Sequence, residues 1–238
     1  LVPGLNYMGN ATCAGTGCHS EDKPVELSGQ MIGDESNIWA ESDPHRFGFK
    51  TLGSDATKTM GEKLKMADAA TDARCLACHA TNPAKSHRGE LFSIKDAVSC
   101  EACHGPGEKW LKPHAEKSWT SKQRATDGTK GLLSKFGLRD TSDLAARADM
   151  CVACHLKIDQ DMIDAGHPPL EFEMYAYNYY VSRKKDAQYA GHWDDTLRGS
   201  EVDARLWALG QAAAFNVTKG PVQVCEIGAA IAKKHIGT

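Results

Sequence analysis

Aromatic side chains and long apolar runs are scarce in this chain of 238 residues. Aromatic residues make up 7% of the sequence and hydrophobic residues 41%, which is a thin supply for a core of this size. The most apolar run, IGAAIA at 227–232, is far shorter than the roughly 20 residues that a membrane-spanning helix needs. The sequence therefore predicts no membrane span, and it suggests that something besides side chains fills part of the interior.

An excess of charge of one sign is also missing. The 28 basic and 31 acidic residues leave a formal net charge of −3. The chain has no basic run either, so we expect no nucleic-acid partner. No signal peptide opens the sequence, which begins LVPGLNY. We expect a mature, exported form whose leader has been removed or left out.

Cysteine is abundant, and its pattern is regular. The odd count of nine cysteines cannot close entirely into internal disulfides. The dipeptide Cys-His occurs four times, always with another cysteine upstream. Three occurrences read C-x-x-C-H, namely CLACH at 75–79, CEACH at 100–104 and CVACH at 151–155, and CAGTGCH at 13–19 is the same motif with two extra residues. Only Cys225 is left over, and we expect it to be a buried small apolar residue.

The C-x-x-C-H spacing is the signature of c-type haem attachment. Positions i, i+3 and i+4 share one face of a helix, so two thiols can bond the vinyl groups of one porphyrin while the histidine reaches the iron. Gly15 and Gly17 would let the longer first motif bulge outward. The predicted attachment residues are Cys13, Cys18, Cys75, Cys78, Cys100, Cys103, Cys151 and Cys154, and the predicted proximal iron ligands are His19, His79, His104 and His155.

Two other uses of the cysteines fit the pattern less well. A zinc site would pair C-x-x-C units around one ion, with ligand histidines spaced away from them. A disulfide framework would not need the histidines. Four covalently attached haems would also explain the thin apolar composition, because the macrocycles supply apolar bulk. Such attachment takes place beyond the cytoplasmic membrane in prokaryotes, so we expect a periplasmic or extracellular protein.

The remaining sequence predicts helices joined by long loops. We expect helices at 141–157, 170–185, 200–215 and 221–236, from their caps and apolar periodicity. Runs that alternate like strands are hardly visible, and the segments 20–55 and 120–140 read as long loops. The prediction is a single domain over 1–238, mainly α-helical with little or no β-sheet, that wraps four haems and ends in C-terminal helices at about 200–236.

Three stretches resemble a known family. They are SNIWAESDPHRFGF (36–49), VSCEACHGPGEKWLKPH (98–114) and DMIDAGHPPLEFEM (161–174), and they resemble tetrahaem cytochromes of the cytochrome c-554 type. The chain is also similar to the related tetrahaem cytochromes that polymerise into extracellular filaments (OmcE-like). The resemblance covers most of the chain from about 13 to 193 and implies a multihaem cytochrome c fold.

The resemblance also implies distal iron ligands among the six remaining histidines. His114 would face the haem of His19, His167 that of His104, and His45 that of His155. The haem of Cys75–His79 is the open case, because the matching iron in cytochrome c-554 lacks a second protein ligand. The candidates there, in order of preference, are His192, His87 and His235. In the filament-forming relatives one haem takes a histidine from the neighbouring subunit.

The function that follows is electron transfer without substrate chemistry. Four haems held by so short a chain lie close together, and they pass electrons by short tunnelling steps. The chain would be a periplasmic or extracellular carrier for redox partner proteins or other haem proteins, or a subunit of a homopolymeric filament. The alternative is a redox enzyme that acts on a small nitrogen or oxygen species at an open Cys75–His79 haem.

Overall fold

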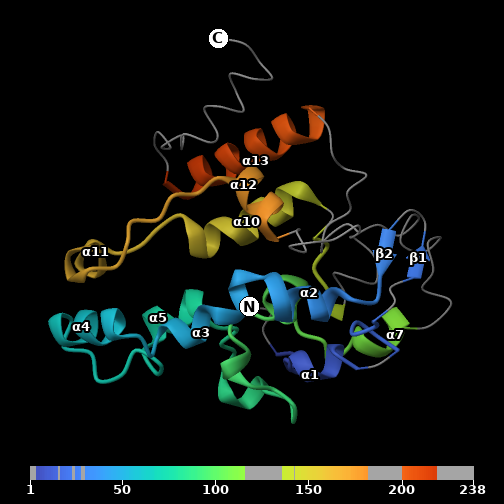
Figure 1. Cartoon of the computed structure of the whole chain (residues 1–238), viewed down its shortest axis with the longest axis horizontal. Coiled ribbons are helices and arrows are strands. Elements are labelled where there is room, and N and C mark those ends of the chain that lie inside the picture. The colour runs from blue at the N-terminus through green and yellow to red at the C-terminus, as the bar shows by residue number, and fades with distance from the viewer. Residues whose placement is uncertain are drawn as a thin grey trace.

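The fold is known from a computed structural model, which describes residues 4–15, 17–22, 25–27, 30–115, 136–141, 143–181 and 200–218. Over these residues the protein consists mainly of short helices linked by long connections (Figure 1). The sheet content described is one antiparallel pair, β1 (Val25–Leu27) with β2 (Gln30–Ile32). The predicted fold class, mainly α with long loops and little sheet, is confirmed.

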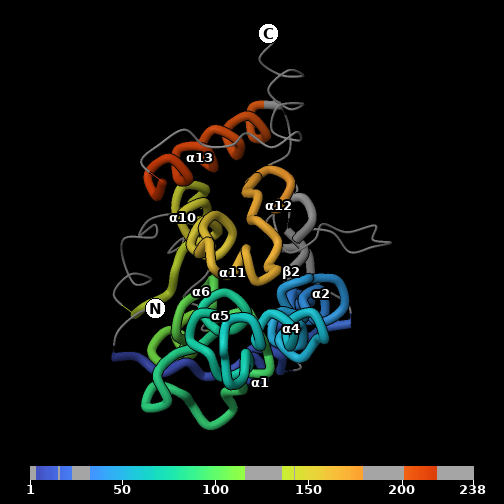
Figure 2. The backbone as a smooth tube through the Cα atoms, turned by 90° about the vertical axis from the view of Figure 1, so that its left-hand side faces the viewer, coloured from blue at the N-terminus to red at the C-terminus, as the bar shows by residue number. Residues whose placement is uncertain are grey.

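The helices fall into two groups in space. Figures 1 and 2 show α10, α12 and α13 gathered at one end of the molecule and the N-terminal helices at the other. The N-terminal group comprises α1 (Asn10–Cys13), α2 (Glu35–Ser42), η1 (Pro44–Phe47), α3 (Gly48–Thr51), α4 (Asp55–Lys63), α5 (Ala73–His79), η2 (Lys85–His87), η3 (Ile94–Asp96), α6 (Cys100–His104) and α7 (Leu111–Ala115). The C-terminal group comprises α10 (Leu144–His155), α12 (Met174–Val181) and α13 (Ser200–Thr218), whereas α11 (Gln160–Ala165) packs against the N-terminal group.

The segment 20–55, predicted as a loop, is largely structured. It contains β1, β2, α2, η1 and α3. Local capping explains part of the difference, because the Asp43 side chain accepts the His45 N–H at 2.9 Å and Pro44 occupies the first position of η1. Each element here is three to eight residues long, which is too short for apolar periodicity to reveal.

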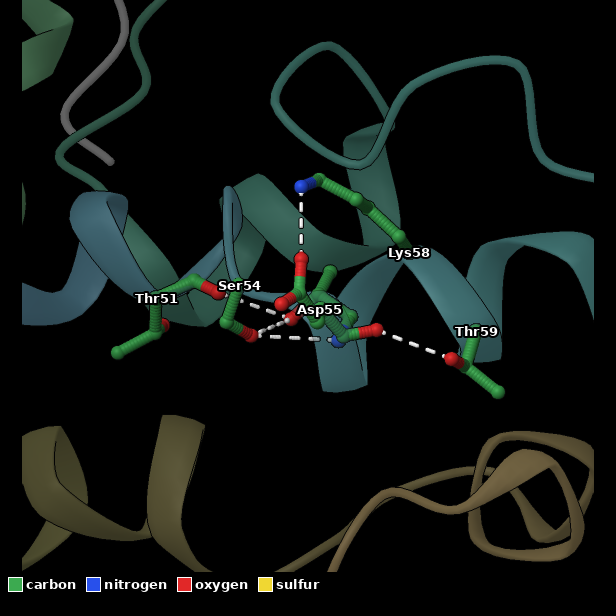
Figure 3. A network of polar contacts seen from close by, with 6 residues as sticks. Thr51, Ser54, Asp55, Lys58 and Thr59 are labelled. Carbon is green, nitrogen blue, oxygen red and sulfur yellow. Dashed lines mark hydrogen bonds and ion pairs between the residues drawn. The ribbon is translucent and has the colours of Figure 1, made fainter.

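Ser54 starts α4 in the same way. Its hydroxyl accepts the Thr57 N–H at 3.2 Å, and the Thr57 hydroxyl donates to the Thr51 carbonyl at 2.9 Å (Figure 3). Asp55 in the first turn pairs with Lys58 at 2.8 Å. The network fixes the turn between α3 and α4, and therefore the direction in which α4 leaves.

The predicted C-terminal helices match the structure where it describes them. The expected helices at 141–157 and 200–215 are α10 and α13, and α12 lies within the expected 170–185. The expected helix at 221–236 and Cys225 lie outside the described residues, as does most of 120–140. Among the described helices, none is long and apolar enough to cross a membrane.

One apolar cluster joins the helices of the C-terminal group. It contains Leu144, Ala148 and Val152 of α10, Leu206, Ala213 and Ala214 of α13, Met174 at the start of α12, and Phe172 just before it. Ala148 and Ala214 are completely buried, so small side chains allow α10 and α13 to approach closely. This packing fixes α10, which carries the fourth cysteine–histidine motif.

A second apolar cluster docks α11 against the N-terminal group. Met162 of α11 packs with Leu52, Cys75 and Leu76. Two polar contacts support it, since Lys63 Nζ donates to the Ala165 carbonyl at 3.0 Å and Arg74 pairs with Asp161 at 3.1 Å. The chain that follows α11 is thereby held next to α5, which carries the second motif.

Candidate metal centres

Three of the four motifs lie on α-helices, and two of these helices begin with a capping aspartate side chain. Asp72 accepts the Arg74 N–H at 2.9 Å at the start of α5, and Asp143 accepts the N–H groups of Ala145 and Ala146 at the start of α10. Helices α5, α6 and α10 all end at the motif histidine. Each helix therefore presents both thiols and the imidazole from consecutive turns.

The longer first motif is arranged differently. Helix α1 ends at Cys13, and the chain then turns before Cys18 and His19. Gly17 has a φ of +83°, a conformation that glycine adopts without strain. The Cys18 N–H closes the turn on the Gly15 carbonyl at 3.0 Å. The two extra residues thus form a turn rather than extending a helix, which agrees with the predicted bulge.

The structure brings histidines together in pairs, each joining a motif histidine to one far away in sequence. The ring centroids of His19 and His114 are 6.1 Å apart, and the planes are nearly parallel at 5°. We call this pair 1. Pair 2 is His79 with His167, at 6.3 Å and 83°, and pair 4 is His155 with His45, at 5.8 Å and 76°.

The spacing within these pairs suits one metal ion held between two rings. Each ring contributes a nitrogen–metal bond of about 2.0 Å and the distance from that nitrogen to the ring centroid. The centroids of two imidazoles on opposite sides of one metal ion therefore lie about 6 Å apart. All the pairs fall close to that value. The residues present therefore fit an iron with two axial imidazoles.

A hydrogen bond at Nδ1 fixes the orientation of five of the paired rings. In His19 and His45 this nitrogen faces a carboxylate oxygen, Glu35 Oε2 and Asp43 Oδ1 respectively. In His79 it faces the Gly48 carbonyl and the Thr51 hydroxyl. In His114 and His167 it faces the carbonyls of Leu111 and Pro168, and all of these distances are 2.5–3.0 Å. Because these carboxylate and carbonyl partners are acceptors, Nδ1 carries the proton and Nε2 keeps its lone pair. A metal-ligating histidine typically has this arrangement.

Burial and charge set the protonation of two of these rings. Burial lowers the pKa of His155 to about 4, with a smaller contribution from His45, so this ring is neutral, as a metal ligand must be. The hydrogen bond that His19 donates to the Glu35 carboxylate raises the pKa of His19. Burial opposes the ionisation of Glu35, but the hydrogen bonds from His19 and from backbone N–H groups, together with the charge of His19, outweigh burial and lower the pKa of that carboxyl.

His167 lies beside a different motif histidine from the one that the resemblance implied. The resemblance placed it at the haem of His104, whereas in the structure its ring lies beside that of His79. The cause is the docking of α11 on α4 and α5 through Met162. Gly166 ends α11 with a φ of +121°, and this turn directs the next residue back along α5. The Cys75–His79 site, predicted to be the uncertain one, thus has a second imidazole from this chain.

The other predicted ligands are placed as follows. His114 lies at His19 and His45 at His155, which are the pairings that the resemblance implied. His87 lies in η2 and is half-buried, and its carbonyl accepts the Tyr7 N–H at 2.9 Å. His192 and His235 lie outside the described residues. Metal ligation by any of these side chains stays a prediction.

The cysteines show which motifs are neighbours. Cys13 of the first motif is hydrogen-bonded to Cys100 of the third, and Cys78 of the second is hydrogen-bonded to Cys154 of the fourth. The latter bond lowers the pKa of Cys78 to about 7. The buried Arg147 guanidinium interacts with cysteines of both the third and the fourth motif. The motifs therefore follow one another in space in the order first, third, fourth, second.

Glu101, inside the third motif, has a structural role that the sequence pattern did not reveal. Its side chain is buried, and its carboxylate accepts the N–H groups of Met8 and Gly107 on Oε1 and that of Gly9 on Oε2, at 2.7–2.8 Å. It thereby ties the N-terminal segment to the loop after α6. The variable position of a C-x-x-C-H motif carries no signal from which this role could be read.

The family comparison covers part of the chain. Residues 12–105 match the family described as "Cytochrome c554 and c-prime". This part resembles that family. It contains the first three motifs and His45, and it is less than half of the chain. No curated protein matches the sequence.

A solved structure is also similar to this chain. It is the reduced state of cytochrome c554 from Nitrosomonas europaea, at 20% sequence identity and a TM-score of 0.41, and the alignment covers 85% of this chain and 78% of that one.

Proposed function

We propose that this protein is a multihaem electron carrier that binds four c-type haems. The observation that carries the proposal is the set of imidazole pairs, in which a motif histidine and a distant histidine stand at the spacing of two axial ligands of one iron. The thiols preceding each motif histidine would hold the porphyrin covalently. Bound haem would supply a one-electron iron couple at each site.

The contacts between motifs support a continuous path for electrons. Thiols of the first and third motifs touch, and so do those of the second and fourth. Arg147 lies with cysteines of the third and fourth motifs. Porphyrins attached at touching thiols have neighbouring edges, so an electron entering at the first motif would reach the second through the third and fourth.

The pairing at His79 favours a carrier over an enzyme. A redox enzyme of this kind would need an iron with an open position, and the Cys75–His79 site was the candidate. His167 beside His79 would fill that position. We therefore propose no substrate site at this iron, and no catalytic residue.

The iron whose second ligand is then unassigned is that of the third motif, at His104. With His114, His167 and His45 assigned to pairs 1, 2 and 4, the candidates for the His104 iron are His87, His192 and His235. A ligand from the same chain gives a discrete periplasmic or extracellular carrier. A ligand donated by another subunit gives a homopolymeric filament, and electron microscopy of the purified protein distinguishes the two.

Mass spectrometry and optical spectra test the function. Protein produced with a c-type maturation system should exceed the polypeptide mass by four haems. A Cys100→Ala, Cys103→Ala double variant should exceed it by three. Carbon monoxide should not bind to pair 2 in the reduced protein. A colourless product at the polypeptide mass, under conditions that mature a control c-type cytochrome, would contradict the proposal.

A further inference from the structure

The hydrogen-bond partners of the paired rings are of two chemical kinds. In pair 1, His19 faces the Glu35 carboxylate at 2.8 Å. In pair 4, His45 faces the Asp43 carboxylate at 2.9 Å. These two rings therefore have negatively charged partners.

The partners in pair 2 are neutral. His79 Nδ1 faces the Gly48 carbonyl at 2.9 Å and the Thr51 hydroxyl at 3.0 Å. His167 Nδ1 faces the Pro168 carbonyl at 2.7 Å. Pair 2 therefore differs from pairs 1 and 4 in the charge next to its rings, although all three share the same ring spacing.

The backbone holds both carboxylates in place. Asp43 Oδ1 also accepts the His45 N–H at 2.9 Å, so one oxygen caps η1 and orients the ring. Glu35 Oε2 also accepts the Gly33 N–H at 3.0 Å. The Asp43 side chain is 8% exposed and that of Glu35 23% exposed, so solvent screens them less than it screens a surface charge.

A carboxylate that accepts the Nδ1 proton makes the imidazole a more basic ligand. A more basic axial ligand stabilises the ferric iron more than the ferrous iron, and the negative charge itself acts in the same direction. We propose that Glu35 and Asp43 are positioning residues that lower the reduction potentials of the irons of pairs 1 and 4 relative to pair 2. This inference rests on the proposed function.

The step concerned is the reduction of ferric to ferrous iron by one electron, which a one-electron donor protein supplies. No bond forms or breaks at the ring, and the Nδ1 proton stays between imidazole and carboxylate. Arg147 lies near the fourth motif and acts in the opposite direction to Asp43. The effect of each carboxylate is therefore measured as a difference between a variant and the wild type.

Amide substitutions remove the charge while keeping the hydrogen bond. In Glu35→Gln and Asp43→Asn the amide oxygen can still accept from the ring and the backbone, and asparagine is as good a helix cap as aspartate. The control is Glu41→Gln, which removes an exposed carboxylate from the same helix as Glu35. Thr51→Val removes a neutral ring partner from pair 2.

Redox titration of the haem-loaded protein, with each haem assigned by nuclear magnetic resonance, is the test. Each amide variant should raise the reduction potential of its own iron by about 59 mV. This shift corresponds to a tenfold change in the equilibrium constant of a one-electron reduction. The reduction potentials of the other irons should not change. Glu41→Gln should shift none, and Thr51→Val should shift pair 2 by less than the amide variants shift their pairs.

Two results would overturn the inference while leaving the proposed function intact. One is fully loaded amide variants with wild-type potentials. The other needs no variant, and so applies even if the substitutions prevent haem loading: a wild-type protein in which the pair 2 iron has a lower potential than the irons of pairs 1 and 4. Absence of haem in the wild type would instead contradict the proposed function.

Discussion

Replacing Glu101 by glutamine should destabilise the protein more than any other change of a carboxylate to its amide among the described residues. The Glu101 side chain is 1% exposed and its two oxygens accept three backbone N–H groups. A glutamine can offer one oxygen to Met8 and Gly107. Its NH₂ group must then face the N–H of Gly9, so a donor meets a donor.

The expected loss follows from these contacts. One hydrogen bond to a charged acceptor disappears, at about 1.5–3 kcal/mol, and a buried N–H is left unsatisfied, at about 1–3 kcal/mol. The two contributions overlap, because they concern the same N–H. We therefore expect the free energy of unfolding to fall by about 3 kcal/mol, a large part of the 5–15 kcal/mol typical of domains.

Guanidinium unfolding of the haem-loaded protein, followed by circular dichroism and by the haem absorption band, measures this loss. Glu41→Gln is the control, since it removes an exposed carboxylate and should change stability by no more than about 0.5 kcal/mol. If Glu101→Gln proves as mild as the control, Glu101 is not what ties the N-terminal segment to the third motif.

Three further predictions concern ligands and protonation. Paramagnetic resonance of the oxidised protein should show a rhombic low-spin signal from pair 1 and large-gmax signals from pairs 2 and 4, because parallel imidazole planes split the iron d orbitals more than perpendicular ones; rhombic signals from all three pairs would contradict these ring angles. His167→Ala should produce one high-spin iron assigned to the motif of His79, and assignment to the third motif would restore the pairing predicted from the sequence. Burial raises the pKa of Glu173, so the wild type should lose stability as pH rises through that raised pKa. Glu173→Gln should abolish this loss and stabilise the protein at neutral pH, whereas Glu171→Gln, which replaces an exposed carboxylate, should change stability at neutral pH by no more than about 0.5 kcal/mol.

The helices that the sequence predicted best are those with both caps and periodicity. Helix α10 follows Asp143 and carries apolar residues toward α13, and α13 has its own apolar stripe. The hairpin of β1 and β2 and the short helices around Asp43 were not predicted. Pieces of three to eight residues leave no period to detect, and their stability comes from contacts with the rest of the fold.

The sequence likewise predicted only some of the residues of the candidate site. The sequence identified the motif histidines, and the resemblance proposed His45, His114 and His167. It did not identify Glu35 or Glu101 as partners of the site. Their neighbours are backbone groups and rings brought close by folding, and an isolated acidic residue in a sequence does not reveal which of these it will face.

The sequence by itself predicted where haem would attach, because in three of the four motifs two thiols and a histidine lie within about one helical turn and form a site through local geometry alone. Only the tertiary structure showed which distant imidazole lies beside the histidines of the first, second and fourth motifs. His167 meets His79 because Met162, Ala165 and Asp161 fasten α11 to the second motif. Such partners are chosen by packing between segments far apart in the chain, and no spacing along the sequence encodes that choice.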